Sequence, residues 1–177
     1  MNHAEALTNH SEPCPSCTAR RDRAAARQAA LDAGGAKIIV LVACTAIKAG
    51  EPRRACELYT SQWFQKARAY AEAFGDEWRI LSARWGLIHP GDITAPYNCT
   101  LNNFSRRERE RWAADVAASV RYAVPYGSRI IMLAGTAYRD PLETMLLRKG
   151  YTVDAPLRGL GIGQQLTYLK TKVENTR

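Results

Sequence analysis

Long apolar runs and an apolar leader are both missing from this chain of 177 residues. The longest apolar run, Ile38 to Cys44, is far shorter than the ~20 residues that a membrane-spanning helix needs. The first ten residues are polar and lack the apolar core of a signal peptide. We therefore expect a cytoplasmic protein with no membrane partner.

A complete set of cysteine ligands for a structural zinc site is missing as well. The chain holds five cysteines, an odd number that does not favour a disulfide framework without an export signal. Cys14 and Cys17 form a single C-x-x-C, which is half of a usual tetrahedral zinc site. Because no second pair follows, we expect no metal and no other cofactor; zinc at Cys14 and Cys17, with His3 or His10 added, is the alternative.

Positive charge is unevenly placed along the chain, whose formal net charge is +8. The first 35 residues contribute none of it, since four arginines there balance four acidic residues. The rest carries 21 Lys and Arg against 13 Asp and Glu. This excess favours nucleic acid or a nucleotide as partner, and a basic surface that serves only solubility is the alternative.

Internal repeats and low-complexity tracts do not occur either. Residues 1–35 are interpreted as a flexible leader with an Ala/Arg-rich helix, and residues 36–177 as a single α/β domain. Within that domain apolar strands alternate with helical patterns and are separated by Gly and Pro. The expected strands are 37–43, 78–83, 129–134 and 151–153. The expected helices are 58–74, 105–124, 137–147 and 164–173.

This alternation predicts right-handed crossovers and a mostly parallel, Rossmann-like three-layer sheet of about four or five strands with helices on both faces. The pattern does not give the strand order. In such sheets ligands bind beyond the carboxyl ends of the strands. That rule selects Cys44, Ser82 and Gly135, which stand at or directly after three strand ends.

Cys44 is a candidate nucleophile, because only a thiolate attacks and a nearby Lys48 or helix N-terminus would favour that form. A small buried apolar residue is the alternative. Lys48 could instead bind a phosphate or carboxylate. Glu57 is a candidate general acid or base, although an acidic residue is also common near a helix start. Tyr59 and Ser61 follow at the entrance to the next helix.

The long segment after Ser82 is too apolar and aromatic for a simple solvent linker, so we expect it to fold back on the site. Trp85 and Tyr97 could stack on a base, and His89 and Asp92 could transfer protons. Anchoring of the loop to the body is the alternative explanation of these aromatic residues.

Two further runs carry polar groups. Gly161 and Gly163 precede Gln164 and Gln165, so a ligand could approach the backbone closely while the amides read a base edge. The spacing is not the G-x-G-x-x-G of dinucleotide loops, and the signal is weak. Residues 106–111 alternate in charge, which predicts a salt-bridged solvent face rather than a nucleic-acid-binding stripe.

Several of these residues also form a pattern that resembles known families. The pattern consists of Cys44 with Lys48, residues 57–61 followed by Phe64, residues 81–88, Pro96-Tyr97, residues 133–138 and residues 161–165. Over residues 37–170 it resembles an uncharacterised family of small phage and bacterial proteins. Residues 81–97 are similar to the signature stretch of the DNA-associated peroxide-stress family YaaA, with Trp85 replacing a tyrosine. A weaker similarity, carried by a cysteine near a lysine and a Ser-x-x-Gly turn, reaches the base-modifying domain of archaeosine synthase.

The resemblance implies a site for a nucleobase or nucleotide. Our leading hypothesis is a base-processing enzyme, glycosylase, hydrolase or transferase-like, that removes or modifies a base. Its catalytic candidates are Cys44, Glu57 and Ser82. Its substrate-binding candidates are Lys48, Tyr59, Ser61, Arg84, Tyr97, Gly135, Tyr138, Gly161, Gly163, Gln164 and Gln165. The alternatives are a non-catalytic DNA-binding or stress-protection protein of the YaaA type, and a small phage interaction protein with a vestigial pocket.

Overall fold

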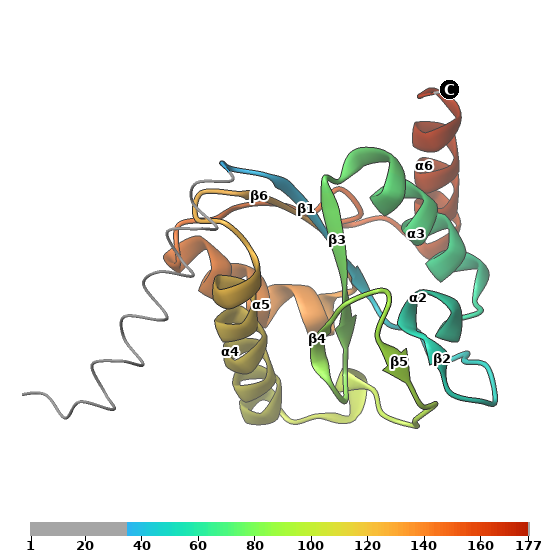
Figure 1. Ribbon diagram of the computed structural model, residues 1–177, viewed down its shortest axis with the longest axis horizontal. Helices are drawn as coiled ribbons and strands as arrows, with labels where there is room; N and C mark the ends of the chain where they lie inside the picture. The colour runs from blue at the N-terminus through green and yellow to red at the C-terminus, as the bar shows by residue number, and fades with distance from the viewer. Residues whose placement is uncertain (1–34, 177) are drawn as a thin grey trace, which may run out of the picture.

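The computed structural model describes residues 35–176, which form three layers: a five-stranded sheet with helices on both faces (Figure 1). The strands run in the order β4-β3-β1-β6-β7 across the sheet. Their bounds are β1 Ile38–Ala43, β3 Glu77–Ser82, β4 Gly86–Ile88, β6 Arg129–Leu133 and β7 Thr152–Asp154. A separate two-stranded sheet pairs β2 Arg53–Arg54 with β5 Ile93–Thr94. The predicted fold class is confirmed.

The central strand β1 is shielded on both faces, as its unbroken apolar sequence IIVLVA predicts for a parallel sheet. Its neighbours β3 and β6 both run parallel to it, and β7 runs parallel to β6. The chain adds β3 on one side of β1 and then returns to add β6 on the other. The carboxyl end of β1 therefore lies at the switch point where open α/β sheets bind ligands.

Four longer helices cover the sheet, α3 and α6 on one face and α4 and α5 on the other (Figure 1). Their bounds are α3 Gln62–Phe74, α4 Arg106–Ala123, α5 Thr136–Arg148 and α6 Ile162–Glu174. Two short helical turns complete the described elements, α2 Ala55–Leu58 and η1 Leu101–Asn103. α4 begins with the predicted capping box, in which Ser105 and Glu108 satisfy each other's backbone N–H groups.

The helix expected over residues 58–74 is split in the structure. Tyr59 leaves the helix and forms an isolated β-bridge with Lys48. Ser61 then caps a new helix, its Oγ accepting from the Phe64 N–H at 3.2 Å. A serine three residues before an apolar helical position is an N-cap signal that the prediction passed over. Gly75 ends α3 as expected, and a Cβ there would stand 2.9 Å from Val40 Cγ2.

The long loop expected after Ser82 contains more structure than predicted. β4 folds back antiparallel on β3 through a turn closed by Gly86, whose φ of +69° suits glycine. β5, an extended stretch through Tyr97, and η1 follow before α4. Leu101 in η1 is fully buried and anchors this segment to the body.

The predicted leader, its helix, and Cys14 with Cys17 lie outside the described residues, apart from Gly35 at its end. Within residues 35–176, no helix combines the length and the apolar character that crossing a membrane requires. No group of three or more His, Cys, Asp and Glu side chains in that part of the chain is placed to hold a metal ion.

Candidate active site at the carboxyl edge of the sheet

Cys44 follows the last residue of β1, and its thiol points at a tyrosine of α5, in one of the helical layers that cover the sheet. Its Sγ lies 3.3 Å from the hydroxyl of Tyr138, which α5 presents from its first turn. The backbone N–H of Cys44 is bonded to the Leu81 carbonyl of β3 at 2.9 Å, so the strand ladder continues to this residue. Cys44 is 9% exposed. The thiol is therefore held in one position at the switch point.

Three hydroxyl groups form a chain beside this thiol. The Tyr97 hydroxyl lies 2.7 Å from Ser82 Oγ and 2.9 Å from the Tyr59 hydroxyl. Ser82 Oγ also accepts from the Trp85 N–H at 3.0 Å. Ser82 and Tyr59 are fully buried, so their hydroxyls need these protein partners. The residue that connects them, Tyr97, belongs to the loop segment expected to fold back on the site, and that segment does so.

Lys48 brings a positive charge to the same place. Its Nζ lies 4.3 Å from the centroid of the Tyr97 ring and 5.6 Å from that of Tyr59, and it donates to the Thr45 carbonyl at 3.0 Å. Desolvation lowers the pKa of Lys48, and the nearby Cys44 and Cys99 act in the opposite direction. We call Cys44, Lys48, Tyr59, Ser82, Tyr97 and Tyr138 the Cys44 cluster.

The tyrosines of the cluster are held neutral at physiological pH. Burial raises the pKa of Tyr59 to about 12. Burial also raises the pKa of Tyr97 and that of Tyr138, and negative charge on Cys44 acts in the same direction. A neutral phenol can donate a hydrogen bond, which an ionised phenolate cannot. The cluster thus places phenol donors and one ammonium group around a thiol, an arrangement that can stabilise a thiolate or an oxyanion.

Trp112 braces the cluster and was missed by the sequence analysis. Its indole N–H donates to the Ser82 carbonyl at 3.0 Å, and its ring packs edge-on against Tyr138 with 5.4 Å between the centroids. It lies on α4, directly after the charged run 106–111 that predicted a solvent face, and it is one of the buried positions of that helix. The only available signal was an aromatic residue at an apolar position of an amphipathic pattern.

The start of α3 joins the cluster to α6. Ser61 Oγ donates to Thr45 Oγ1 at 3.0 Å, next to Cys44. Two residues later, Trp63 Nε1 donates to Gln165 Oε1 at 2.8 Å. The Gln165 amide also donates to the Leu160 carbonyl at 2.8 Å, so both ends of this side chain bond to the protein. Gln165 thus connects two helices in the structure.

Other predicted residues lie away from the thiol's hydrogen bonds. Gln164 Oε1 accepts from the Gly161 N–H at 2.9 Å and caps its own helix. Gly163 is exposed and nothing lies within 4 Å of the position of an added Cβ. Gly135, also exposed, begins α5 three residues before Tyr138.

Glu57 and Arg84 are not among the groups bonded in the Cys44 cluster. Glu57 is exposed on α2, and its charge contributes to the raised pKa of Arg68 on α3. Arg84 lies over the Trp85 ring, 4.8 Å from the centroid, in the exposed turn between β3 and β4. His89 and Asp92 belong to one turn, in which Asp92 Oδ2 accepts from the His89 N–H at 2.8 Å.

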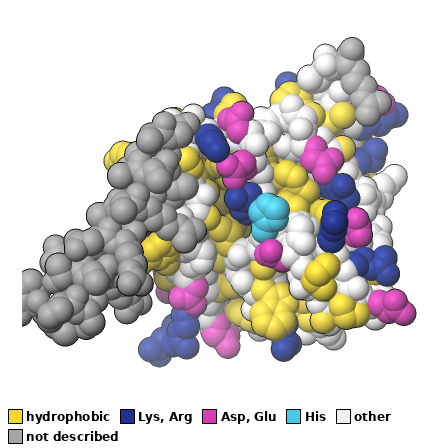
Figure 2. Space-filling model, viewed as in Figure 1, with side chains coloured by type: hydrophobic (Ala, Val, Ile, Leu, Met, Phe, Trp, Pro, Cys, Tyr) yellow, Lys and Arg dark blue, Asp and Glu magenta, His cyan; other side chains and the backbone are white. Residues whose placement is uncertain are grey.

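Charge on the visible face of the molecule is mixed. Basic and acidic side chains are interspersed in Figure 2 rather than segregated into one stripe. Part of the predicted solvent face of α4 is confirmed, because Arg106 and Glu110 form an exposed ion pair at 2.8 Å. Arg106 also lines a groove of about 570 Å³ between α4 and α5, whose lining includes Thr136 directly after Gly135. We call it the arginine groove.

Comparison with known proteins supports the predicted uncharacterised family and gives no support for a relationship to YaaA or archaeosine synthase. The chain is 29% identical over 135 residues to the uncharacterised protein YfjM of Bacillus subtilis (strain 168), which covers 70% of this chain and 82% of that protein. No solved structure matches this chain. The model of the family of unknown function DUF6884 matches residues 39–171, and the chain belongs to that family.

Proposed function

We propose that this protein is an enzyme that removes or modifies a base in a nucleic acid or nucleotide, with Cys44 as the reactive group. The observation that carries the proposal is the position of the Cys44 thiol. It stands at the carboxyl end of the central strand, 3.3 Å from the Tyr138 hydroxyl and within the electrostatic reach of Lys48. A structural cysteine needs no such set of donors around it.

Each group around Cys44 has its own role in this proposal. The Tyr138 phenol would donate to the sulfur of Cys44, whose proton passes to water, and the sulfur would attack an electron-poor ring carbon of the base. The C–S bond forms as a ring C=N π bond opens, and closure of that bond expels the group that the carbon carried. Water would then displace the thiolate and complete the exchange. Lys48 would stabilise negative charge that develops on the substrate. Ser82, which the sequence makes a catalytic candidate, would instead hold Tyr97 in place, because its hydroxyl is already bonded to that phenol at 2.7 Å.

A nucleobase is the proposed target for two reasons. The body of the chain is strongly basic, with 21 Lys and Arg against 13 Asp and Glu after residue 35, which favours phosphate-bearing ligands. The second reason is Tyr97, a half-buried aromatic side chain that could stack on a base and whose hydroxyl bonds to Ser82 beside Cys44.

The experiment is mass spectrometry of nucleosides and free bases after incubation of the full chain with DNA, tRNA and nucleotides, both modified and unmodified. We expect a released or altered base that disappears with Cys44→Ala. Cys56→Ala is the matched control, because Cys56 is half-buried on α2 and contributes only its backbone groups to the hydrogen bonds described. Equal activity of the two variants would rule out Cys44 as the reactive group.

A non-catalytic nucleic-acid-binding protein is the second candidate, favoured by the arginines of the groove between α4 and α5. In that case no substrate yields a product, while retention on DNA falls steeply as salt rises. Loss of retention in arginine variants, together with the absence of a product from every substrate, would establish this candidate.

A further inference from the structure

We propose that the arginine groove binds the phosphate group of a nucleotide, either free or within a nucleic-acid strand. The inference deepens the proposed function, on which it rests for the identity of the ligand as a nucleotide. The groove measures about 570 Å³, within the range of small-molecule sites. Its walls come from the first turns of α4 and from one face of α5.

The groove adjoins the Cys44 cluster through α5. Thr136 and Ala137 of the first turn line the groove, whereas Tyr138, the next residue, turns to Cys44 at 3.3 Å. Successive residues of a helix point about 100° apart, so one turn of α5 serves both places. A ligand in the groove would therefore lie on the other side of the helix start that holds the Tyr138 phenol.

Apolar and polar surfaces are separated inside the groove. Ala137, Pro141 and Met145 follow one another at helical spacing and are half-buried along the α5 wall. Pro141 has no backbone N–H to donate, so the Ala137 carbonyl lacks its usual helical partner. An apolar wall with a spare acceptor suits the face and the amino group of a base.

Two arginines of the groove are left without an acidic partner among the described residues. The acidic groups that line it are already paired: Glu110 with Arg106 at 2.8 Å, and Asp140 with Arg139 at 2.9 Å. Arg109 and Arg148 line the same groove from α4 and α5, and neither forms an ion pair within residues 35–176. Two guanidinium groups that line one groove from two helices, without a carboxylate partner, are suited to a phosphate.

The test measures binding by the full chain at fixed salt. The probes are a nucleoside 5′-monophosphate, its unphosphorylated nucleoside and a short fluorescent single-stranded oligonucleotide. We expect the phosphorylated probes to bind and the nucleoside to bind at least tenfold more weakly. Arg109→Glu and Arg148→Glu should each weaken binding about tenfold or more.

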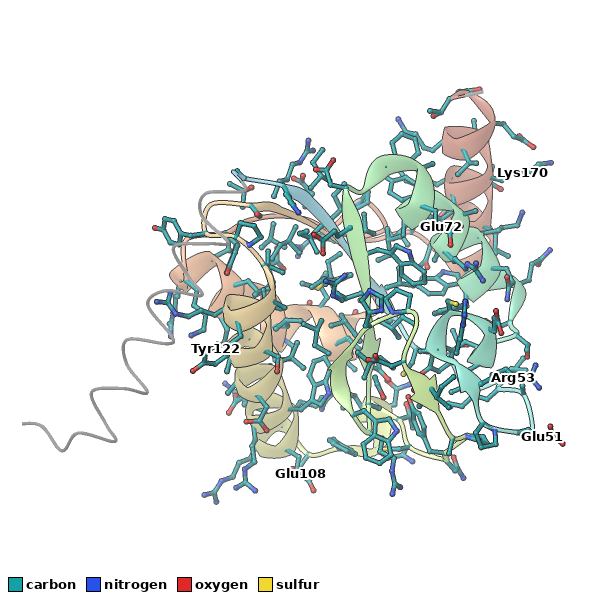
Figure 3. All side chains as sticks on the ribbon, in the orientation of Figure 1. Glu51, Arg53, Glu72, Glu108, Tyr122 and Lys170 are labelled. Atoms are coloured by element: carbon teal, nitrogen blue, oxygen red, sulfur yellow. The ribbon has the colours of Figure 1, made fainter. Side chains whose placement is uncertain are left out.

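Arg121→Glu is the matched control for Arg109→Glu, because it makes the same charge change at the opposite end of α4, about 18 Å further along the helix. Glu108 and Tyr122 mark these two ends in Figure 3. We expect binding by Arg121→Glu to stay within about twofold of the unchanged protein, since screening limits charge effects to a Debye length of ~10 Å. An equal loss in Arg121→Glu, or no binding of either phosphorylated probe, would overturn the proposal.

The two phosphate sources are distinguished in the same experiment. Binding of the monophosphate and the oligonucleotide alike assigns the groove to a single phosphate, whereas binding of the oligonucleotide alone assigns it to a strand. Cys44→Ala should bind both probes normally. If product formation depends on Cys44 while both groove variants bind normally, the groove assignment is wrong and the proposed function stands. If the groove variants lose binding while Cys44→Ala retains all product formation, the proposed function is wrong and the groove assignment stands.

Discussion

The Cys44 cluster and the arginine groove lie on two sides of the first turn of α5 and are built on opposite principles. In the cluster, buried hydroxyls bond to one another, as Ser82, Tyr97 and Tyr59 do. In the groove, Arg109 and Arg148 face open space without an acidic partner among residues 35–176. Buried polar groups need protein partners, whereas water can satisfy the donors of an exposed guanidinium group until a ligand binds. Our proposals of chemistry in the first region and binding in the second rest on this difference.

The largest expected effect separates chemistry from binding. Cys44→Ala should lower product formation about a thousandfold or more, because it removes the nucleophile itself, and should leave nucleotide affinity unchanged. The paired measurements are product yield by mass spectrometry and probe binding. A parallel fall of both quantities in this variant would show that the two regions are not separable.

The double variant Arg109→Glu with Arg148→Glu should have the complementary effect. We expect oligonucleotide affinity to fall about a hundredfold, from two losses of about tenfold each, with no change in the free energy of unfolding beyond about 0.5 kcal/mol. The slope of log affinity against log salt should decrease by about 1.4 for a single strand, since two phosphate contacts are removed. An unchanged salt slope would contradict the assignment of these arginines to phosphate contacts.

Removal of a single hydroxyl group from the Cys44 cluster should lower the free energy of unfolding, whereas the arginine changes in the groove should not. Tyr97→Phe breaks the bonds to Ser82 and Tyr59 and should lower the free energy of unfolding by about 2 kcal/mol in a urea titration. Tyr122→Phe is the control, because that side chain is 58% exposed (Figure 3). A Tyr97 variant as stable as the Tyr122 variant would mean that the hydroxyl chain does not stabilise the fold.

The smallest effect is expected from alkaline pH. The pKa of Tyr59 is raised to about 12 in the folded state, so its contribution to stability is complete below about pH 10 and is lost as pH rises towards 12. At about pH 11 the loss from this group is about 1 kcal/mol. Urea titrations at about pH 9 and about pH 11 measure it, and Tyr59→Phe should show a smaller fall.

The elements and the strand-end residues could be predicted because they follow from local patterns. The IIVLVA run predicts a buried parallel strand, and Ser105 with Glu108 predicts the start of α4; both are present. The placement of Cys44 and Ser82 at the carboxyl ends of β1 and β3 then follows from chain order. The break at Tyr59 and the strand β4 are among the features that were missed, because each depends on pairing with a distant or folded-back segment.

The contacts of the site could not be predicted because they join residues far apart in sequence. Cys44 and Tyr138 are 94 residues apart, and Tyr59 and Tyr97 are 38 apart. Their meeting requires both the strand order and the path of the segment that carries Tyr97 across the sheet edge. Glu57 and Gln164 carry suitable functional groups, but their interactions are with other residues than Cys44. Glu57 interacts with Arg68, and Gln164 bonds to the Gly161 N–H.

The sequence by itself determined the layers of this protein, the strand ends that carry Cys44 and Ser82, and the helix starts, because periodicity and capping act over a few residues. Only the tertiary structure decided which side chains face one another. The alternating charges of α4 predict a solvent face, yet the packing of α4 against α5 turns Arg109 into a groove and Trp112 against Ser82 and Tyr138. The physical reason is that a helix has several faces, and its neighbours select which of them are covered.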